Sequence, residues 1–389
     1  MKRANRRLTI ALGIAQTYAW ATTYYLPAVI VGAVADELEQ SRAAIVGGFS
    51  WSLLIAGLCA PRVGRLIDRQ GGRGVLAASS LVMAGGLALL AFAQGLVGWY
   101  AAWTVLGAGM AMGLYDAAFA TIGRLLGDAA RPAIIGVTLM AGLASTVGWP
   151  AGAALLELIG WRQTALLYAA IFLAMNLPLY LIFVPPAGPA PPRAERREDA
   201  AALRTARRAF LLLAVYFTLR AVVSSVVSVH VLTLLEGLGL AAAAAVAIAS
   251  LIGPSQVAGR IVDWTLARRL DPLQNSRLGA ALLPIGVIAL MLPGPAAVTA
   301  VAFAVAYGMS NGILTISRGA LPLALFGPNG YAALLGRLAL PVLLAQAAAP
   351  TAVAPLIDLW PAWAVFGLSG GLAVIALLCL LPLRLPSRT

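Results

Sequence analysis

The chain alternates long apolar runs with short segments that hold most of its charged residues. About 20 apolar residues are enough to cross a bilayer as an α-helix. Windows of that length predict twelve spans, at residues 8–34, 43–61, 75–94, 99–123, 133–157, 163–184, 209–234, 241–262, 278–293, 296–317, 332–357 and 361–383. Residues 185–208 are rich in proline, alanine and charge without an apolar period, which predicts a solvated linker between six-helix halves at 1–184 and 209–389.

The composition supports a membrane protein. The chain is 61% hydrophobic and 11% charged, whereas a soluble domain has about 25% charged residues. The first apolar run is longer than the roughly 7–15 apolar residues of a signal peptide, so we expect it to stay as a helix. Cys59 and Cys379 lie within apolar runs, and two such distant thiols predict neither a disulfide framework nor a metal site.

The basic residues predict the orientation. All but three of the 27 lysines and arginines lie at the termini or in every second connection, the exceptions being Arg42, Arg162 and Arg220. Such an excess marks the cytoplasmic side, so both termini are expected in the cytoplasm of a cell with a bacterial-type inner membrane. The net charge of +13 therefore needs no nucleic-acid partner, and no aromatic residues alternate with the arginines to stack on bases.

One phrase occurs twice. Residues 64–68 read Gly-Arg-Leu-Ile-Asp, and residues 259–263, about half a chain later, read Gly-Arg-Ile-Val-Asp. Residues 121–124 and 315–318 echo one another at nearly the same spacing. With six predicted spans in each half and the phrase on the same face, the halves are expected to be parallel repeats.

The first copy continues to Arg73 as Arg-Gln-Gly-Gly-Arg, and this segment resembles the signature loop of the major facilitator superfamily. The resemblance implies an all-α membrane fold with two six-helix halves around a central cavity, and a transporter, not an enzyme, without cofactor or metal. The second copy has Trp264 in place of an arginine, and Trp103 replaces the arginine that the family carries in span four. Residues 148–152 resemble the glycine-proline motif of antiporters, with close helix packing as the alternative.

Both loops are candidates for a conformational latch. Glycines at Gly64, Gly71 and Gly72 are expected to form a tight turn, and Asp68 can accept hydrogen bonds from arginines or from a helix N-terminus. The latch residues that we expect are Gly64, Asp68, Arg69, Gly72, Arg73, Gly259 and Asp263.

Polar residues inside spans are candidates for substrate binding, because burying them in a membrane is costly. Arg220, Ser224 and Ser228 form one stripe on the seventh span, and a guanidinium beside hydroxyls suits an oxyanion. A structural ion pair is the alternative. The resemblance implies that spans one, four, seven and ten line the cavity, which adds Asn311, Tyr24 and Tyr25 to the expected site.

Asp116 is the only acid deep within a predicted span. It can carry a proton between conformations, or form a fixed ion pair with Arg220 or Arg124. The sequence therefore predicts a secondary transporter of a small organic anion that works by alternating access, with proton coupling through Asp116. Arg220 with its serines weakly resembles the monocarboxylate-carrier branch.

Two alternatives stay open at this point, an exporter of drugs, metabolites or metalloids and a membrane sensor without transport. The expected partners are a small-molecule substrate, the lipid bilayer and protons, with no nucleic acid. We expect the chain to act as a monomer.

Overall fold

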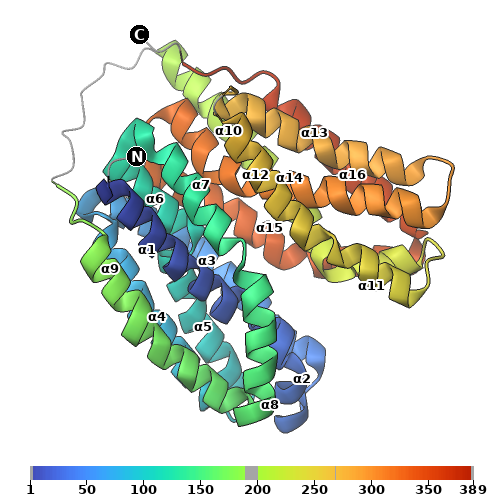
Figure 1. Ribbon diagram of the computed structural model, residues 1–389, viewed down its shortest axis with the longest axis horizontal. Helices are drawn as coiled ribbons and strands as arrows, with labels where there is room; N and C mark the ends of the chain where they lie inside the picture. Colours follow the sequence, from blue (N-terminus) through green and yellow to red (C-terminus); the bar gives the residue numbers. More distant parts are fainter. Residues whose placement is uncertain (1–2, 189–199, 268, 387–389) are drawn as a thin grey trace. The chain divides into compact units, whose positions relative to one another are not determined.

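The structure is a computed structural model that describes residues 3–188, 200–267 and 269–386, and these residues are almost entirely helical (Figure 1). In chain order the elements are α1 (Arg3–Ala19), the π-helix η1 (Trp20–Tyr24), α2 (Pro27–Glu37), α3 (Arg42–Gln70), α4 (Gly72–Ala91), α5 (Leu96–Gly113), α6 (Tyr115–Leu126), the short 3₁₀ turn η2 (Gly127–Ala129), α7 (Ala130–Ala141), α8 (Ala144–Ile171), the π-helix η3 (Phe172–Asn176), α9 (Leu177–Phe183), α10 (Ala200–Glu236), α11 (Ala242–Ser250), α12 (Ile252–Leu266), α13 (Pro272–Met291), α14 (Ala296–Phe326), α15 (Tyr331–Leu359) and α16 (Ala362–Leu380).

Eleven helical segments of the described chain are long and apolar enough to cross a membrane. One of them, Ala130–Phe183, has 54 residues, about 80 Å of helix, whereas the hydrocarbon core of a bilayer is about 30 Å thick. Gly160 breaks this segment with a φ of 75°, between the spans predicted at 133–157 and 163–184. Its length and this break fit two crossings, in agreement with the predicted all-α membrane fold.

Several helix ends differ from the predicted spans. Helix α14 runs on to Phe326 and stops at Gly327, whose φ is 75°, because a glycine in this region ends a helix without strain. Helix α10 begins at Ala200, inside the segment expected to be a linker. Apolar length sets the span, whereas helices continue past the membrane until a glycine or proline stops them.

The chain forms two compact units, which we call unit 1 (residues 1–192 and 328–340) and unit 2 (residues 193–327 and 341–389). In unit 1, α3 and α4 both pack against α5, and α4 also packs against α8. In unit 2, α12 and α13 both pack against α14, and α13 also packs against α16. Two consecutive helices in each unit thus pack against the helix that follows them, in the same way.

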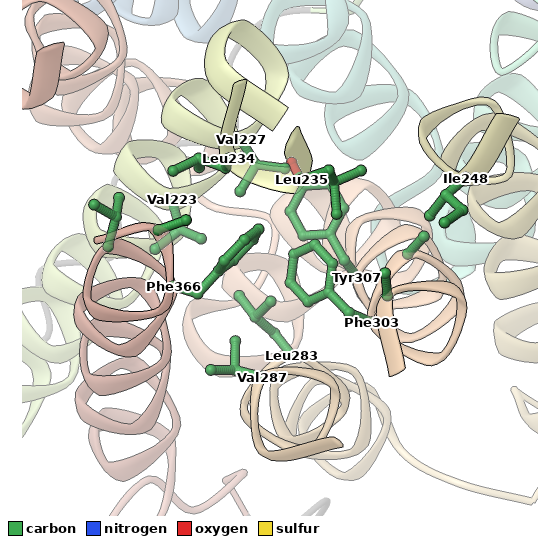
Figure 2. Close-up of a cluster of buried hydrophobic side chains, with 14 of the residues drawn as sticks. Val223, Val227, Leu234, Leu235, Ile248, Leu283, Val287, Phe303, Tyr307 and Phe366 are labelled. Atoms are coloured by element: carbon green, nitrogen blue, oxygen red, sulfur yellow. The ribbon is translucent and has the colours of Figure 1, made fainter. Parts of the chain in front are cut away.

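An apolar cluster in unit 2 holds α10, α13, α14 and α16 together. Figure 2 shows the rings of Phe303, Tyr307 and Phe366 gathered among aliphatic side chains of α10 and α13. Phe303 stacks on Tyr307 with centroids 5.7 Å apart and meets Phe366 edge-on at 4.9 Å. Tyr307 belongs to this cluster through its ring, and its hydroxyl donates to the carbonyl oxygen of Ser224 at 3.2 Å. The cluster therefore sets the relative position of α10 and α14, where the candidate site lies.

Candidate functional site

Arg220 is buried in unit 2, with 1% of its surface exposed. Its Nη2 donates to the hydroxyl of Ser310 at 2.8 Å and to the side-chain oxygen of Asn311 at 3.2 Å. Ser310 in turn donates to the carbonyl oxygen of Gly279 at 2.5 Å. Because its proton is used there, the Ser310 oxygen is oriented to accept from Arg220.

The rest of the guanidinium has no hydrogen-bond partner in the described chain. Both Nε and Nη1 of Arg220 are buried and unpaired, and the described residues of unit 2 form no ion pair with it. These atoms carry three N–H groups, and leaving buried donors of a charged group unsatisfied is costly. The structural ion pair considered from the sequence is therefore not formed within unit 2, and the donors are open to an oxyanion.

The other polar residues of the seventh span line up with Arg220. The Ser224 hydroxyl donates to the Asn311 side-chain oxygen at 2.9 Å, so Asn311 accepts from both Arg220 and Ser224. Ser228 is exposed one turn further along α10 and lies beside the Tyr307 hydroxyl. The structure thus brings Arg220, Ser224 and Asn311 into one hydrogen-bonded group, with Ser228 at its edge.

Tyr24 and Tyr25 lie in an aromatic cluster of unit 1, at the π-helix that interrupts the first span. The ring of Trp20 lies 4.7 Å from Tyr24 and 4.7 Å from Tyr115 of α6. Tyr24 and Tyr25 meet edge-on at 5.4 Å, and Tyr25 meets Trp149 at 5.7 Å. Single π-turns within helices occur frequently at functional sites.

Asp116 follows a break in the fourth span. Helix α5 ends at Gly113, Leu114 is extended, and Asp116 lies in the first turn of α6. Gln16 donates to the carbonyl oxygen of Gly113 at 2.6 Å and so stabilises the break. The described residues contain no group of three or more His, Cys, Asp or Glu side chains that could hold a metal. The Asp116–Arg220 pair considered from the sequence stays a prediction.

Asp68 contacts the N-terminus of α15 within unit 1. Its Oδ1 accepts from the backbone N–H of Ala332 at 3.2 Å, and its Oδ2 from that of Ala333 at 2.7 Å. The first N–H groups of a helix have no partner inside the helix, and a negative charge there is favourable. The sequence-based expectation that Asp68 can accept from a helix N-terminus agrees with this geometry.

The arginines around Asp68 bind backbone carbonyls. Arg124 donates through Nη1 to the carbonyl oxygen of Asp68 at 2.6 Å and through Nη2 to that of Gly188 at 3.0 Å. Arg73 donates to the carbonyl oxygen of Leu181 at 2.6 Å. Arg69 is exposed in the last turn of α3. Arg124 and Arg73 therefore brace the loop against the end of α9 and the residues that follow it.

The expectation that Gly64 and Gly72 form a tight turn was wrong. Gly64 lies inside α3, where a Cβ would collide with the carbonyl oxygen of Ala332. Gly72 is the first residue of α4, where a Cβ would collide with the Thr121 hydroxyl. Of the three glycines, Gly71 alone lies in the turn, with a φ of 84°. Gly64 and Gly72 are instead required for close approach between helices.

The second copy of the phrase is buried in unit 2. Gly259 lies against the backbone of Met309, where a Cβ would collide with the carbonyl oxygen. Asp263 is 2% exposed and accepts from the Asn275 side chain at 2.9 Å. Arg260, assigned from the sequence to the basic cytoplasmic segments, is only 6% exposed. Its position within the predicted span 241–262 was the available signal for this burial.

The glycine-proline segment of the fifth span packs closely on the first span. A Cβ on Gly148 would lie 2.7 Å from the Cβ of Ala21, and one on Gly152 would lie 3.3 Å from Val29. Trp103, which replaces the family's arginine in span four, is fully buried between the rings of Trp99 and Phe49. The small residues therefore have a packing role that implies no direction of transport.

Comparisons with known proteins agree with this fold. Residues 11–336 match the family model described as Major Facilitator Superfamily. A crystal structure of the human organic anion transporter MFSD10 (TETRAN) matches with 18% identity and a TM-score of 0.74, covering 97% of this chain and 99% of that one. The proton:xylose symporter XylE bound to 6-bromo-6-deoxy-D-glucose matches with 14% identity and a TM-score of 0.71, covering 96% and 94%. A comparison with curated proteins finds no match. Since the family model covers most of the chain, this protein belongs to the major facilitator superfamily of transporters.

Proposed function

We propose that this secondary transporter carries a small organic anion and that Arg220 is its principal binding group. The observation that carries the proposal is the buried guanidinium whose Nε and Nη1 have no partner in the described chain. Burying a permanent cation inside a membrane span costs free energy, and such residues mark sites of binding or conformational change. An anion that pairs with it offsets that cost.

The geometry of Arg220 suggests how the anion binds. Nη1 and Nη2 form the end of the guanidinium, which suits the two oxygens of a carboxylate, but Nη2 already donates to Ser310 and Asn311. The Asn311 contact is the longer, at 3.2 Å. We propose that the carboxylate displaces Asn311 from Arg220 and leaves Ser310 in place.

This exchange would couple binding to the spans themselves. Asn311 belongs to α14 and also accepts from Ser224 of α10, so releasing it changes a contact between the seventh and tenth spans. Ser224 and Ser228 would then donate to the anion. Tyr24 and Tyr25, which lie in unit 1, stay predictions as substrate-binding residues.

A thermal-shift screen tests the role of Arg220. Purified wild type, Arg220→Ala and Arg220→Lys are compared in lactate, benzoate, succinate, sulfate and phosphate, with sodium gluconate as the ionic-strength control. At least one of these anions should raise the Tm of wild type most, raise that of Arg220→Lys less, and raise that of Arg220→Ala least. Equal shifts in all three proteins would refute anion binding at Arg220.

We further propose that Asp116 couples transport to protons. Support comes from its place at the break in the fourth span, since transporters bind coupling ions at interrupted helices. In proteoliposomes, Asp116→Asn should abolish the dependence of uptake on a pH gradient while leaving substrate exchange intact. Undiminished proton dependence would remove Asp116 from this role.

The orientation is a proposal as well. The arginine distribution supports cytoplasmic termini in a bacterial-type inner membrane. Import and export are distinguished by flux into proteoliposomes under gradients of opposite sign, and net flux only outward from the cytoplasmic face would favour the exporter.

A further inference from the structure

Unit 2 buries a second arginine that the proposed function does not use. Arg260 lies in α12 and is 6% exposed, and its Nε and Nη1 have no partner in the described chain. The buried face of α12 also carries Ser255 and Asp263. In both Arg220 and Arg260, Nε and Nη1 are therefore buried without a hydrogen-bond partner in the described chain.

No acid of the described chain pairs with Arg260. Asp263, one turn later on the same helix, accepts from Asn275 of α13. A buried charge without a partner is strongly unfavourable, so a variant with an apolar side chain at position 260 is expected to be more stable than the wild type. Arg260 therefore has the character of a functional group that costs stability.

The position in the repeat does not explain the burial. Arg65, the matching residue in the first copy of the phrase, is exposed at the end of α3. Side chains on a helix lean toward its N-terminus, so Arg260, near the C-terminal end of α12, leans back along the helix.

Both arginines flank the same stretch of α14. A Cβ on Gly312 would lie 3.2 Å from the backbone nitrogen of Arg260. The preceding residue, Asn311, accepts from Arg220. The side chain of Arg220 on α10 and the backbone of α12 at Arg260 therefore meet α14 at consecutive residues.

We infer that Arg260 is a second oxyanion-binding group, which takes the same class of anion as Arg220 at another position beside α14. This inference rests on the proposed function of Arg220. An anion that passes from one guanidinium to the other stays paired with a cation along its path, so neither position has to hold it tightly.

Thermal shifts by benzoate separate the two arginines. We compare wild type, Arg220→Met, Arg220→Met with Arg260→Met, and Arg220→Met with Arg65→Met, in equal concentrations of sodium benzoate or sodium gluconate. The shift should be reduced in Arg220→Met, abolished when Arg260 is also replaced, and kept when Arg65 is replaced instead. Equal responses of Arg220→Met and its Arg260→Met double variant, including no response in either, would overturn the inference. Equal responses of wild type and Arg220→Met would instead contradict the role of Arg220.

The single variant Arg260→Met gives a second readout. Without added anion its Tm should rise, because an unpaired buried charge is removed, while benzoate uptake into proteoliposomes should fall about tenfold, equivalent to about 1.4 kcal/mol, relative to Arg65→Met. Arg260→Lys should recover part of the uptake. A lower Tm would make Arg260 a structural residue, and unchanged uptake would exclude it from the path. Should Arg260→Met fail to fold, Arg260→Gln replaces it with the same expectations for uptake.

Discussion

Replacing Asp68 should release the N-terminus of α15 from the end of α3. Asp68 is the acceptor for the N–H groups of Ala332 and Ala333. From Leu334 onward the helix satisfies its own donors, since the Leu334 N–H bonds the carbonyl oxygen of Gly330 at 3.0 Å. Asp68→Ala therefore removes the acceptor of two donors at once and leaves the other contacts of this helix end intact.

The size of the effect follows from the two bonds. A capping side chain contributes about 0.5–2 kcal/mol, and a hydrogen bond to a charged group contributes about 1.5–3 kcal/mol. Because Asp68 is only half-buried, we take the lower end and expect about 2 kcal/mol for Asp68→Ala, close to a 30-fold change in the local opening equilibrium. Asp68→Asn keeps one neutral acceptor and should lose about 1 kcal/mol, or roughly fivefold.

Hydrogen–deuterium exchange of peptides covering residues 331–340 measures this opening. Exchange should be fastest in Asp68→Ala, slower in Asp68→Asn and slowest in the wild type. Gln70→Ala is the matched control, because Gln70 is exposed two residues further on and should leave the peptide unchanged. If Asp68→Ala exchanges as slowly as wild type at Ala332 and Ala333, the carboxylate does not hold this helix end and the latch reasoning fails.

Two further predictions concern packing and the opposite end of unit 1. Gly64→Ala should lower the Tm by several degrees and speed hydrogen–deuterium exchange in residues 331–340, because its Cβ would meet the carbonyl oxygen of Ala332. The control is Gly74→Ala, whose Cβ meets nothing within 4 Å and which should leave the Tm unchanged or raise it through the better helix propensity of alanine. Equal Tm values for the two variants would contradict the close approach. Glu37→Gln should lower the Tm by at most about 4 °C. The Glu37–Arg162 ion pair at 2.8 Å has side chains that are 48% (Glu37) and 27% (Arg162) exposed, and such pairs contribute about 0.2–1 kcal/mol. The control Glu39→Gln, at an exposed residue two positions later, should leave the Tm unchanged, and a fall in the Tm of Glu37→Gln that does not depend on salt would argue against an ion-pair origin.

The transmembrane architecture could be predicted from the sequence because a bilayer demands about 20 apolar residues for every crossing. That demand holds for each span by itself, before any helix meets another. It also made Arg220 and Asp116 visible, since a charge within an apolar run stands out without knowledge of its neighbours. The hydrogen-bond partners of these residues could not be predicted in the same way. The hydrogen bond that orients Ser310 toward Arg220 depends on Gly279 in another helix.

The repeated phrase shows most clearly which properties follow from the sequence and which depend on packing. The repetition of residues 64–68 at 259–263, and the place of each copy along the predicted spans, can be recognised without a structure. Packing was needed to show that Gly64 contacts α15, that Asp68 accepts from Ala332 and Ala333, and that Arg260 is buried while Arg65 is exposed. The physical reason is that membrane insertion depends on the hydropathy of one segment, whereas burial, close approach and hydrogen-bond partners depend on which helices pack together.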